Sequence, residues 1–118
     1  PRWWQVDYLG WAALRTLAAH YLLSARREDG QPVDPVARFH LGNGALVHAV
    51  HAEADTSAKG RAQSASVMVN YLYDLGKVAQ NHDRYAAAGE IAASSDIRSL
   101  DAAAKKLDLR EAEAAQQA

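Results

Sequence analysis

Histidines lie on both sides of the dipeptide Asn43-Gly44, with His40 before it and His51 after it. Histidine is the side chain whose ordinary pKa lies nearest to neutrality, so it serves most often as a general acid or base. Short runs of strand-forming residues flank the dipeptide, and Asn-Gly is the strongest short-range signal for a two-residue hairpin turn. The sequence therefore predicts a β-hairpin over 35–52 that carries these histidines.

The predicted hairpin has two faces, because successive side chains of a strand point to opposite sides. With the Asn-Gly pair in the turn, His40 and His51 share one face, while Phe39 and His48 share the opposite, core face. We therefore expect His40 and His51 to face solvent or a cleft. A half-exposed strand histidine without any function fits the same pattern, and a register slip of one residue would exchange the two faces.

A metal site is one alternative for these residues. The candidate ligands are His40, His48, His51, Glu53 and Asp55. On a strand, His48 and His51 would point to opposite faces, and no second pair has a standard ligand spacing. The sequence also has no G-x-S-x-G nucleophile elbow and no Gly-rich phosphate loop. We expect no metal ligands and no cofactor.

The next element predicted is a helix over 57–75, with Ser57 at its N-cap and Gly76 just beyond its end. Lys59 falls in the first turn, where the helix dipole favours acidic side chains. A cation beside free N–H groups and Gly60 would suit a bound anion. Solvated charge on a surface turn is the alternative.

Two further stretches complete the predicted α+β fold. Apolar residues at three- and four-residue steps predict a helix over 8–27, and the alanine- and charge-rich stretch 77–118 predicts an irregular and helical tail. The chain has 118 residues, of which 49% are hydrophobic, but it holds one Phe and one Met. So small a supply of large apolar side chains suits part of a larger domain.

Composition also limits the partners and the location. The net charge of −1 argues against nucleic acid. No apolar run approaches the roughly 20 residues that a membrane span needs, and the chain has no cysteine for disulfides. The first residues, Pro1 to Gln5, contain neither an initiator Met nor a signal-peptide pattern. We expect the interior of a longer, cytoplasmic protein.

Ordered blocks of the sequence resemble one known family. Residues 34–45 read DPVARFHLGNGA, which resembles the P-V-A-x-F-H-L-x-N-G-A signature of malonyl-CoA decarboxylases. The other blocks that resemble this family are, in chain order, 54–60, 63–64 with 68–73, 81–82 and 91–94. The resemblance runs over about residues 14–100 without large gaps.

The resemblance implies a fold, a reaction and partners. The family joins an N-terminal helical domain to a GNAT-like (acetyltransferase-like) catalytic domain, of which this chain would be a C-terminal fragment: helix, β-hairpin, long helix, helical tail. The reaction converts malonyl-CoA to acetyl-CoA and carbon dioxide in fatty-acid metabolism, without metal or organic cofactor. Expected partners are malonyl-CoA and the rest of the parent enzyme, and a homo-oligomer is possible.

The resemblance also implies roles for individual residues. His40 corresponds to the catalytic histidine of the family's F-H-L motif, where it pairs with a serine from an upstream segment. Tyr73, the second tyrosine of the N-Y-x-Y block, is expected in the same catalytic pocket. The expected substrate-binding residues are His51, Ser57, Lys59, Gly60 and Asn70.

The chain departs from the family pattern in two respects. Where the family has Arg-hydrophobe-Asn-Trp, residues 49–52 read AVHA, so His51 replaces an asparagine. The partner serine and the CoA pyrophosphate loop belong to upstream segments that these 118 residues lack. We therefore expect the isolated fragment to be inactive. The alternative is a degenerate, non-catalytic acyl-CoA-binding or interaction module.

Overall fold

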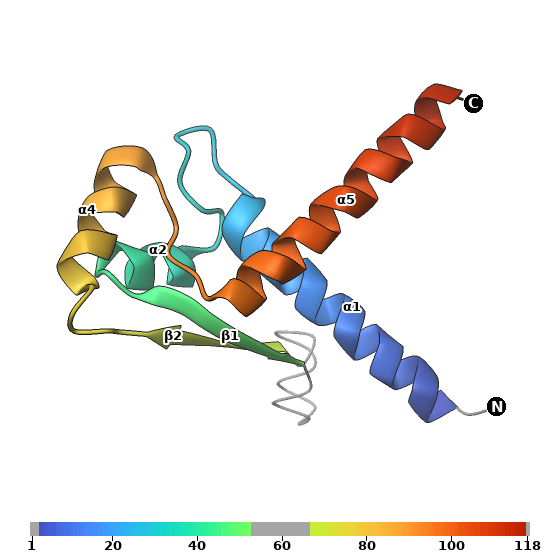
Figure 1. Ribbon diagram of the computed structural model, residues 1–118, viewed down its shortest axis with the longest axis horizontal. Coiled ribbons are helices and arrows are strands. Elements are labelled where there is room, and N and C mark those ends of the chain that lie inside the picture. Colours follow the sequence, from blue (N-terminus) through green and yellow to red (C-terminus); the bar gives the residue numbers. More distant parts are fainter. Residues whose placement is uncertain (1–2, 53–66, 118) are drawn as a thin grey trace.

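The computed structural model describes residues 3–52 and 67–117. This part of the chain contains four helices and one antiparallel pair of strands, whose arrangement can be followed in Figure 1. In chain order the elements are α1 (Trp3–Ser24), α2 (Pro35–Gly42), β1 (Leu46–Ala52), β2 (Val67–Leu72), α4 (Val78–Ala88) and α5 (Ser95–Gln117). The α+β class predicted from the sequence is confirmed. None of the described helices is long and apolar enough to cross a membrane.

Helix α2 replaces the first strand of the predicted hairpin, so the hairpin over 35–52 is wrong. Asp34 caps the helix, because its Oδ2 accepts a hydrogen bond of 2.8 Å from the backbone N–H of Ala37. Pro35 occupies the first turn, where a missing N–H costs nothing. The Asn43-Gly44 pair ends this helix: the Gly44 N–H donates to the Leu41 carbonyl at 3.0 Å. Helix caps thus outweigh the hairpin signal.

The side chains of α2 divide differently from those of the predicted strand. Ala37 and Leu41, one helical turn apart, are buried. Phe39, expected in the core, is 64% exposed. The buried residues are therefore four positions apart, as in a helix, and not two apart, as in a strand. Different side chains of this segment face the core as a result.

The two strands form the only sheet in the described residues, with order β1-β2. Leu46 pairs with Leu72 and Ala52 with Val67, and a bulge at His48 interrupts the register. The predicted helix over 57–75 is wrong from Val67 onward, and residues 57–66 lie outside the described part. Strand-forming residues occupy alternate positions of β2, where they are half-buried while their neighbours are exposed. This alternation is typical of a strand and explains why the segment is not a helix.

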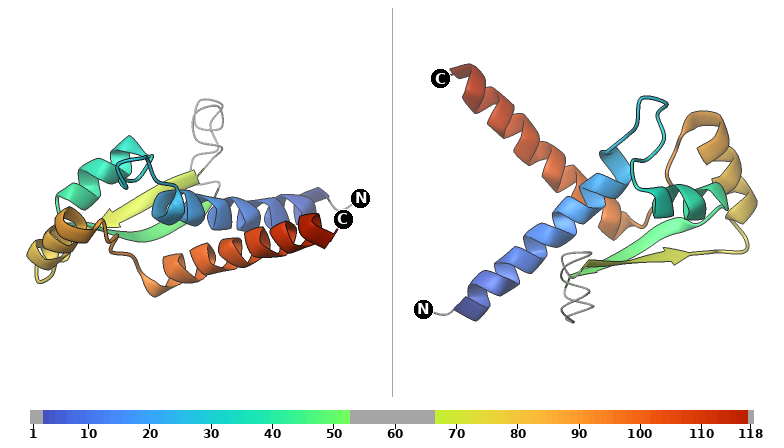
Figure 2. Two further views of the ribbon diagram at one scale, coloured as in Figure 1. Left: turned by 90° about the horizontal axis from the view of Figure 1, so that it is seen from above. Right: turned by 180° about the vertical axis from the view of Figure 1, so that it is seen from behind.

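The helix predicted over 8–27 is confirmed as α1, with different ends, and the 77–118 tail contains α4 and α5. Figure 1 shows α1 and α5 crossing beside the sheet. Figure 1 and Figure 2 show α2 and α4 next to each other at one end of the two strands, and the two helices are in direct contact. A polar cluster joins the crossing helices: Asp101 accepts hydrogen bonds from Ser24 Oγ (2.8 Å) and His20 Nδ1 (2.9 Å). Lys105 Nζ lies 3.3 Å from the same carboxylate.

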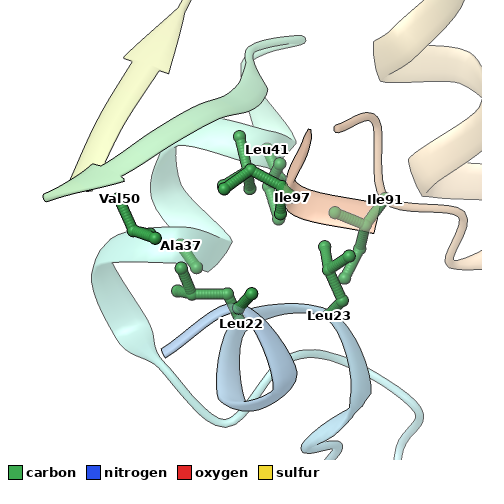
Figure 3. Close-up of a cluster of buried hydrophobic side chains, with 9 residues drawn as sticks. Leu22, Leu23, Ala37, Leu41, Val50, Ile91 and Ile97 are labelled. Atoms are coloured by element: carbon green, nitrogen blue, oxygen red, sulfur yellow. The ribbon is translucent and has the colours of Figure 1, made fainter. Parts of the chain in front are cut away.

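One hydrophobic cluster connects all of these elements except α4 and β2, whose side chains pack against it from the side. Figure 3 shows how the side chains from α1, α2, β1 and the start of α5 converge. The buried members are Ala19, Leu22, Leu23, Ala37, Leu41, Val47, Val50, Ile91 and Ile97. None of these buried members is aromatic, which limits the apolar area that the cluster buries.

Gly44 is required where α2 meets α4. Its φ is +87°, and a Cβ there would lie 2.4 Å from the Val78 carbonyl oxygen. Gly30 has a similar φ of +82° with open space around it.

We predict that Gly30→Ala costs about 1 kcal/mol of unfolding free energy from backbone strain alone. Gly44→Ala should cost at least about 2 kcal/mol more, because the clash adds to the strain. Urea unfolding measures both, and equal losses would contradict the packing.

Asp101 predicts acid sensitivity of the α1–α5 contact. Burial raises the pKa of this carboxyl, but hydrogen bonds from Ser24, His20 and Lys105 outweigh burial and leave the pKa below the ordinary value of 3.8. A lowered pKa contributes stability above pH 3.8 that is lost as pH falls below it. The unfolding free energy should therefore drop below about pH 4, and Asp101→Asn should flatten that drop. Asp83→Asn, at an exposed position, is the control and should leave the drop unchanged.

Candidate active site

His40 is in the last turn of α2, with its side chain against residues at the end of β2. Its Nδ1 is joined to Tyr73 Oη by a hydrogen bond of 2.7 Å. Its ring stacks on the ring of Tyr71, with centroids 4.4 Å apart and an angle of 19° between the planes. The ring of Phe39 packs edge-on against the imidazole, with ring centroids 5.2 Å apart. Three aromatic rings thus fix the orientation of one imidazole.

The backbone explains why these groups meet. Tyr71 is on the face of β2 that turns toward the core, opposite Val47 of β1. Tyr73 follows two residues later, just beyond the strand, and so reaches the same side. The sequence predicted His40 and Tyr73 in one pocket, and the structure brings the two side chains into contact. Their catalytic roles remain a prediction.

Tyr71 was missed by the sequence analysis. Burial raises the pKa of its phenol to about 12, with smaller contributions from Asp34 and Tyr21. The ring therefore stays neutral near pH 7 and offers His40 a flat, uncharged surface. The signal was present in the N-Y-x-Y block, since tyrosines two residues apart share a face of a strand. Predicting this block as a helix concealed that signal.

Helix α4 holds the end of α2 from the other side. His82 donates from Nδ1 to the Gly42 carbonyl at 2.8 Å, and Asn81 Nδ2 donates to the Gly44 carbonyl at 3.2 Å. These carbonyls are otherwise the unpaired groups at a helix end. The Asn81-His82 block, noted in the sequence only as a resemblance, thus holds the turn that follows His40.

His51 and Asn70 form a second pair, on the other face of the sheet. Asn70 Nδ2 donates to His51 Nε2 at 3.0 Å. Asn70 precedes Tyr71 on β2, so its side chain points away from His40. The expectation that His51 shares a face with His40 is therefore wrong, because it depended on a hairpin that does not form. His48, expected in the core, is exposed at the strand bulge.

The remaining predicted residues are not all placed. Ser57, Lys59 and Gly60 lie outside the described residues. Within the described part of the chain, no three His, Asp or Glu side chains gather in a way that could hold a metal ion.

The pair of His40 and Tyr73 leaves one imidazole nitrogen for other chemistry. Among the described residues, nothing forms a hydrogen bond with His40 Nε2. If Nδ1 of the neutral imidazole donates to Tyr73 Oη, Nε2 is an acceptor. If Tyr73 Oη donates to Nδ1, Nε2 carries the imidazole proton and is a donor. An imidazole held in this way is suited to acid–base catalysis or to binding a polar ligand atom.

Comparison with known proteins identifies the family. Residues 5–116 match the model of the malonyl-CoA decarboxylase C-terminal domain. The mitochondrial malonyl-CoA decarboxylase of Rattus norvegicus is 40% identical over 87 residues, which are 74% of this chain and 18% of that protein. The mitochondrial enzyme of Anser anser anser is also 40% identical, over 74% of this chain and 17% of its own length. The chain thus spans about a fifth of the curated relatives that it matches.

Solved structures agree with the sequence match. The malonyl-CoA decarboxylase of Rhodopseudomonas palustris superposes with a TM-score of 0.72 at 47% identity, covering 75% of this chain and 20% of that one. The enzyme of Agrobacterium vitis gives a TM-score of 0.74 at 44% identity, covering 81% of this chain and 23% of that one. From the family model and these matches in sequence and fold, we conclude that the chain belongs to the malonyl-CoA decarboxylase family, in its C-terminal domain.

Proposed function

We propose that this chain supplies the histidine side of the active site of a malonyl-CoA decarboxylase, with His40 as its acid–base group and Tyr73 as the residue that orients it. The hydrogen bond of 2.7 Å between His40 Nδ1 and Tyr73 Oη carries this proposal. It joins two residues that lie far apart in the sequence and that the family resemblance had assigned to one pocket.

The reaction requires two contributions from the protein: stabilisation of an enolate oxygen and delivery of a proton to carbon. When the carboxylate of malonyl-CoA leaves as carbon dioxide, the electron pair of the broken C–C bond forms an enolate on the thioester. The enolate oxygen needs hydrogen-bond donors, and the carbon then needs a proton to give acetyl-CoA. An imidazole whose Nδ1 bonds to a tyrosine hydroxyl can present Nε2–H to the oxygen or relay a proton to the carbon.

The surround of His40 fits this task. Stacking on Tyr71 and the hydrogen bond to Tyr73 restrict rotation of the imidazole, so less ordering is left for the transition state. The upstream serine that the family resemblance implies would approach Nε2, the nitrogen that the described residues leave unpaired. His51 and Asn70, on the opposite face, do not belong to this pocket, and for Ser57, Lys59 and Gly60 substrate binding remains part of the proposal.

The alternative was a degenerate, non-catalytic module. That alternative had two grounds: the partner serine is missing from these 118 residues, and His51 replaces an asparagine expected beside His40. Because His51 bonds to Asn70 on the other face of the sheet, its substitution does not alter the contacts of His40. The geometry therefore favours an intact histidine site over a decayed one.

The proposed partners follow from the share of the relatives that the chain spans. Because this chain supplies only the histidine side of the active site, catalysis also needs the remainder of the catalytic domain. The isolated 118 residues should therefore not turn over malonyl-CoA. Exposed apolar side chains such as Val36 (56%) and Phe39 (64%) on α2 offer contact area for that remainder. Oligomerisation and a cytoplasmic location remain predictions, and the enzymes of Rattus norvegicus and Anser anser anser are named as mitochondrial.

A chimera tests the proposal. In it, this chain replaces the matching segment of the Rhodopseudomonas palustris enzyme. We predict that His40→Asn lowers kcat at least about a hundredfold, because general acid–base groups contribute typically 10²–10⁴-fold, while KM changes little. Tyr73→Phe should lower kcat about tenfold, the worth of one hydrogen bond to a catalytic group. Steady-state kinetics with malonyl-CoA measures both.

His51→Asn is the matched control, since it makes the same substitution on the opposite face of the sheet. It should leave kcat within about twofold of the unmodified chimera. If His51→Asn lowered kcat as much as His40→Asn, or if His40→Asn kept most of the activity, the assignment of His40 would have to be abandoned.

A further inference from the structure

A polar cavity lies away from His40, between α4, the start of β1 and the segment that leads into α5. Its volume is about 290 Å³. The N-cap residue of α4, Lys77, lines the cavity together with Gln80, Asn81 and Arg84 of the helix. They recur at steps of three and four residues, so one face of α4 forms a wall of the cavity. Figure 1 shows this helix beside the segment that connects it to α5.

The charge of the cavity differs from that of the whole chain. Three cations line it, Lys77, Arg84 and Arg98, against one anion, Glu90. The chain as a whole has a net charge of −1. The lining of this cavity therefore carries net positive charge, which attracts anions from solution.

The described residues neutralise these cations only in part. Lys77 has no ion-pair partner among the described residues. Arg84 lies 3.9 Å from Glu90, the limit of an ion pair, and both side chains are about half exposed. Arg98 donates one hydrogen bond, from Nη2 to the Ile91 carbonyl at 2.9 Å. That bond fixes the guanidinium and leaves its other N–H groups for a ligand.

The N-terminus of α4 adds to the same field. Lys77 is the N-cap residue, and no side chain caps the first N–H groups of this helix. The positive end of the helix dipole is therefore located where Lys77 and Gln80 line the cavity.

We propose that this cavity binds a small phosphate-bearing anion. Arginine forks match phosphate oxygens in pairs, and lysine adds a point charge. Pockets for drug-sized ligands occupy roughly 300–1,000 Å³, so this cavity suits a phosphate or diphosphate group better than a whole cofactor. Free phosphate and the phosphate groups of coenzyme A share this chemistry.

The cavity is separate from the histidine site. None of His40, Tyr71 and Tyr73 lines it. One contact links the two, because Asn81, a lining residue, donates to the Gly44 carbonyl just after α2. The proposal does not depend on the decarboxylase activity and would survive failure of the kinetic test.

The test is a titration of the ¹⁵N-labelled chain with inorganic diphosphate and, in a second series, with coenzyme A. Sodium chloride at matched ionic strength is the reference. We expect saturable amide shifts that are largest at residues 77–81, and dissociation constants raised about tenfold by Lys77→Gln or Arg84→Gln, each of which removes one charge-assisted hydrogen bond. Lys106→Gln, at an exposed position of α5 outside the cavity, is the matched control and should change nothing.

The possible results distinguish the two ligands or overturn the proposed anion site. Tighter binding of coenzyme A than of diphosphate assigns the site to the phosphates of that ligand, and equal binding assigns it to free phosphate. Shifts that do not saturate, that sodium chloride reproduces, or that survive both cavity substitutions overturn the proposal.

Discussion

The helix cap at Asp34 is the interaction on which the candidate site depends. Its carboxylate bonds to the Ala37 N–H, and Pro35 supplies a backbone already suited to a first turn. N-caps of this kind contribute about 1 kcal/mol. The contribution is modest, but it selects a period of 3.6 over a period of 2 for the whole F-H-L motif. That choice puts Leu41 in the core and His40 against β2.

A second constraint acts at the other end of α2. Gly44 allows α4 to approach closely, and Asn81 and His82 of α4 then bond to the carbonyls of the closing turn. The helix that carries His40 is thus held at both ends by groups outside it. A catalytic imidazole needs such support, because small displacements of a reacting group lower the rate strongly.

The sequence predicted some features well and others poorly, for identifiable reasons. The α+β class, helix α1 and the pairing of His40 with Tyr73 were predictable, the last only through the family resemblance. The hairpin was wrong because Asn-Gly also ends helices, and its signal had to be weighed against Asp34-Pro35. The strand β2 was missed because alanine and serine upstream of it extended a helical pattern into a run of alternating strand formers. The error at α2 then put His51 on the wrong face.

The most direct test of the account is a nuclear Overhauser measurement on the chain, with assigned Cα shifts. We expect helical Cα shifts over 35–42 and strong cross-peaks between the ring protons of His40 and Tyr71, whose ring centroids lie 4.4 Å apart. Strand-type shifts over 35–42, without any His40–Tyr71 cross-peak, would restore the hairpin and contradict the site described above.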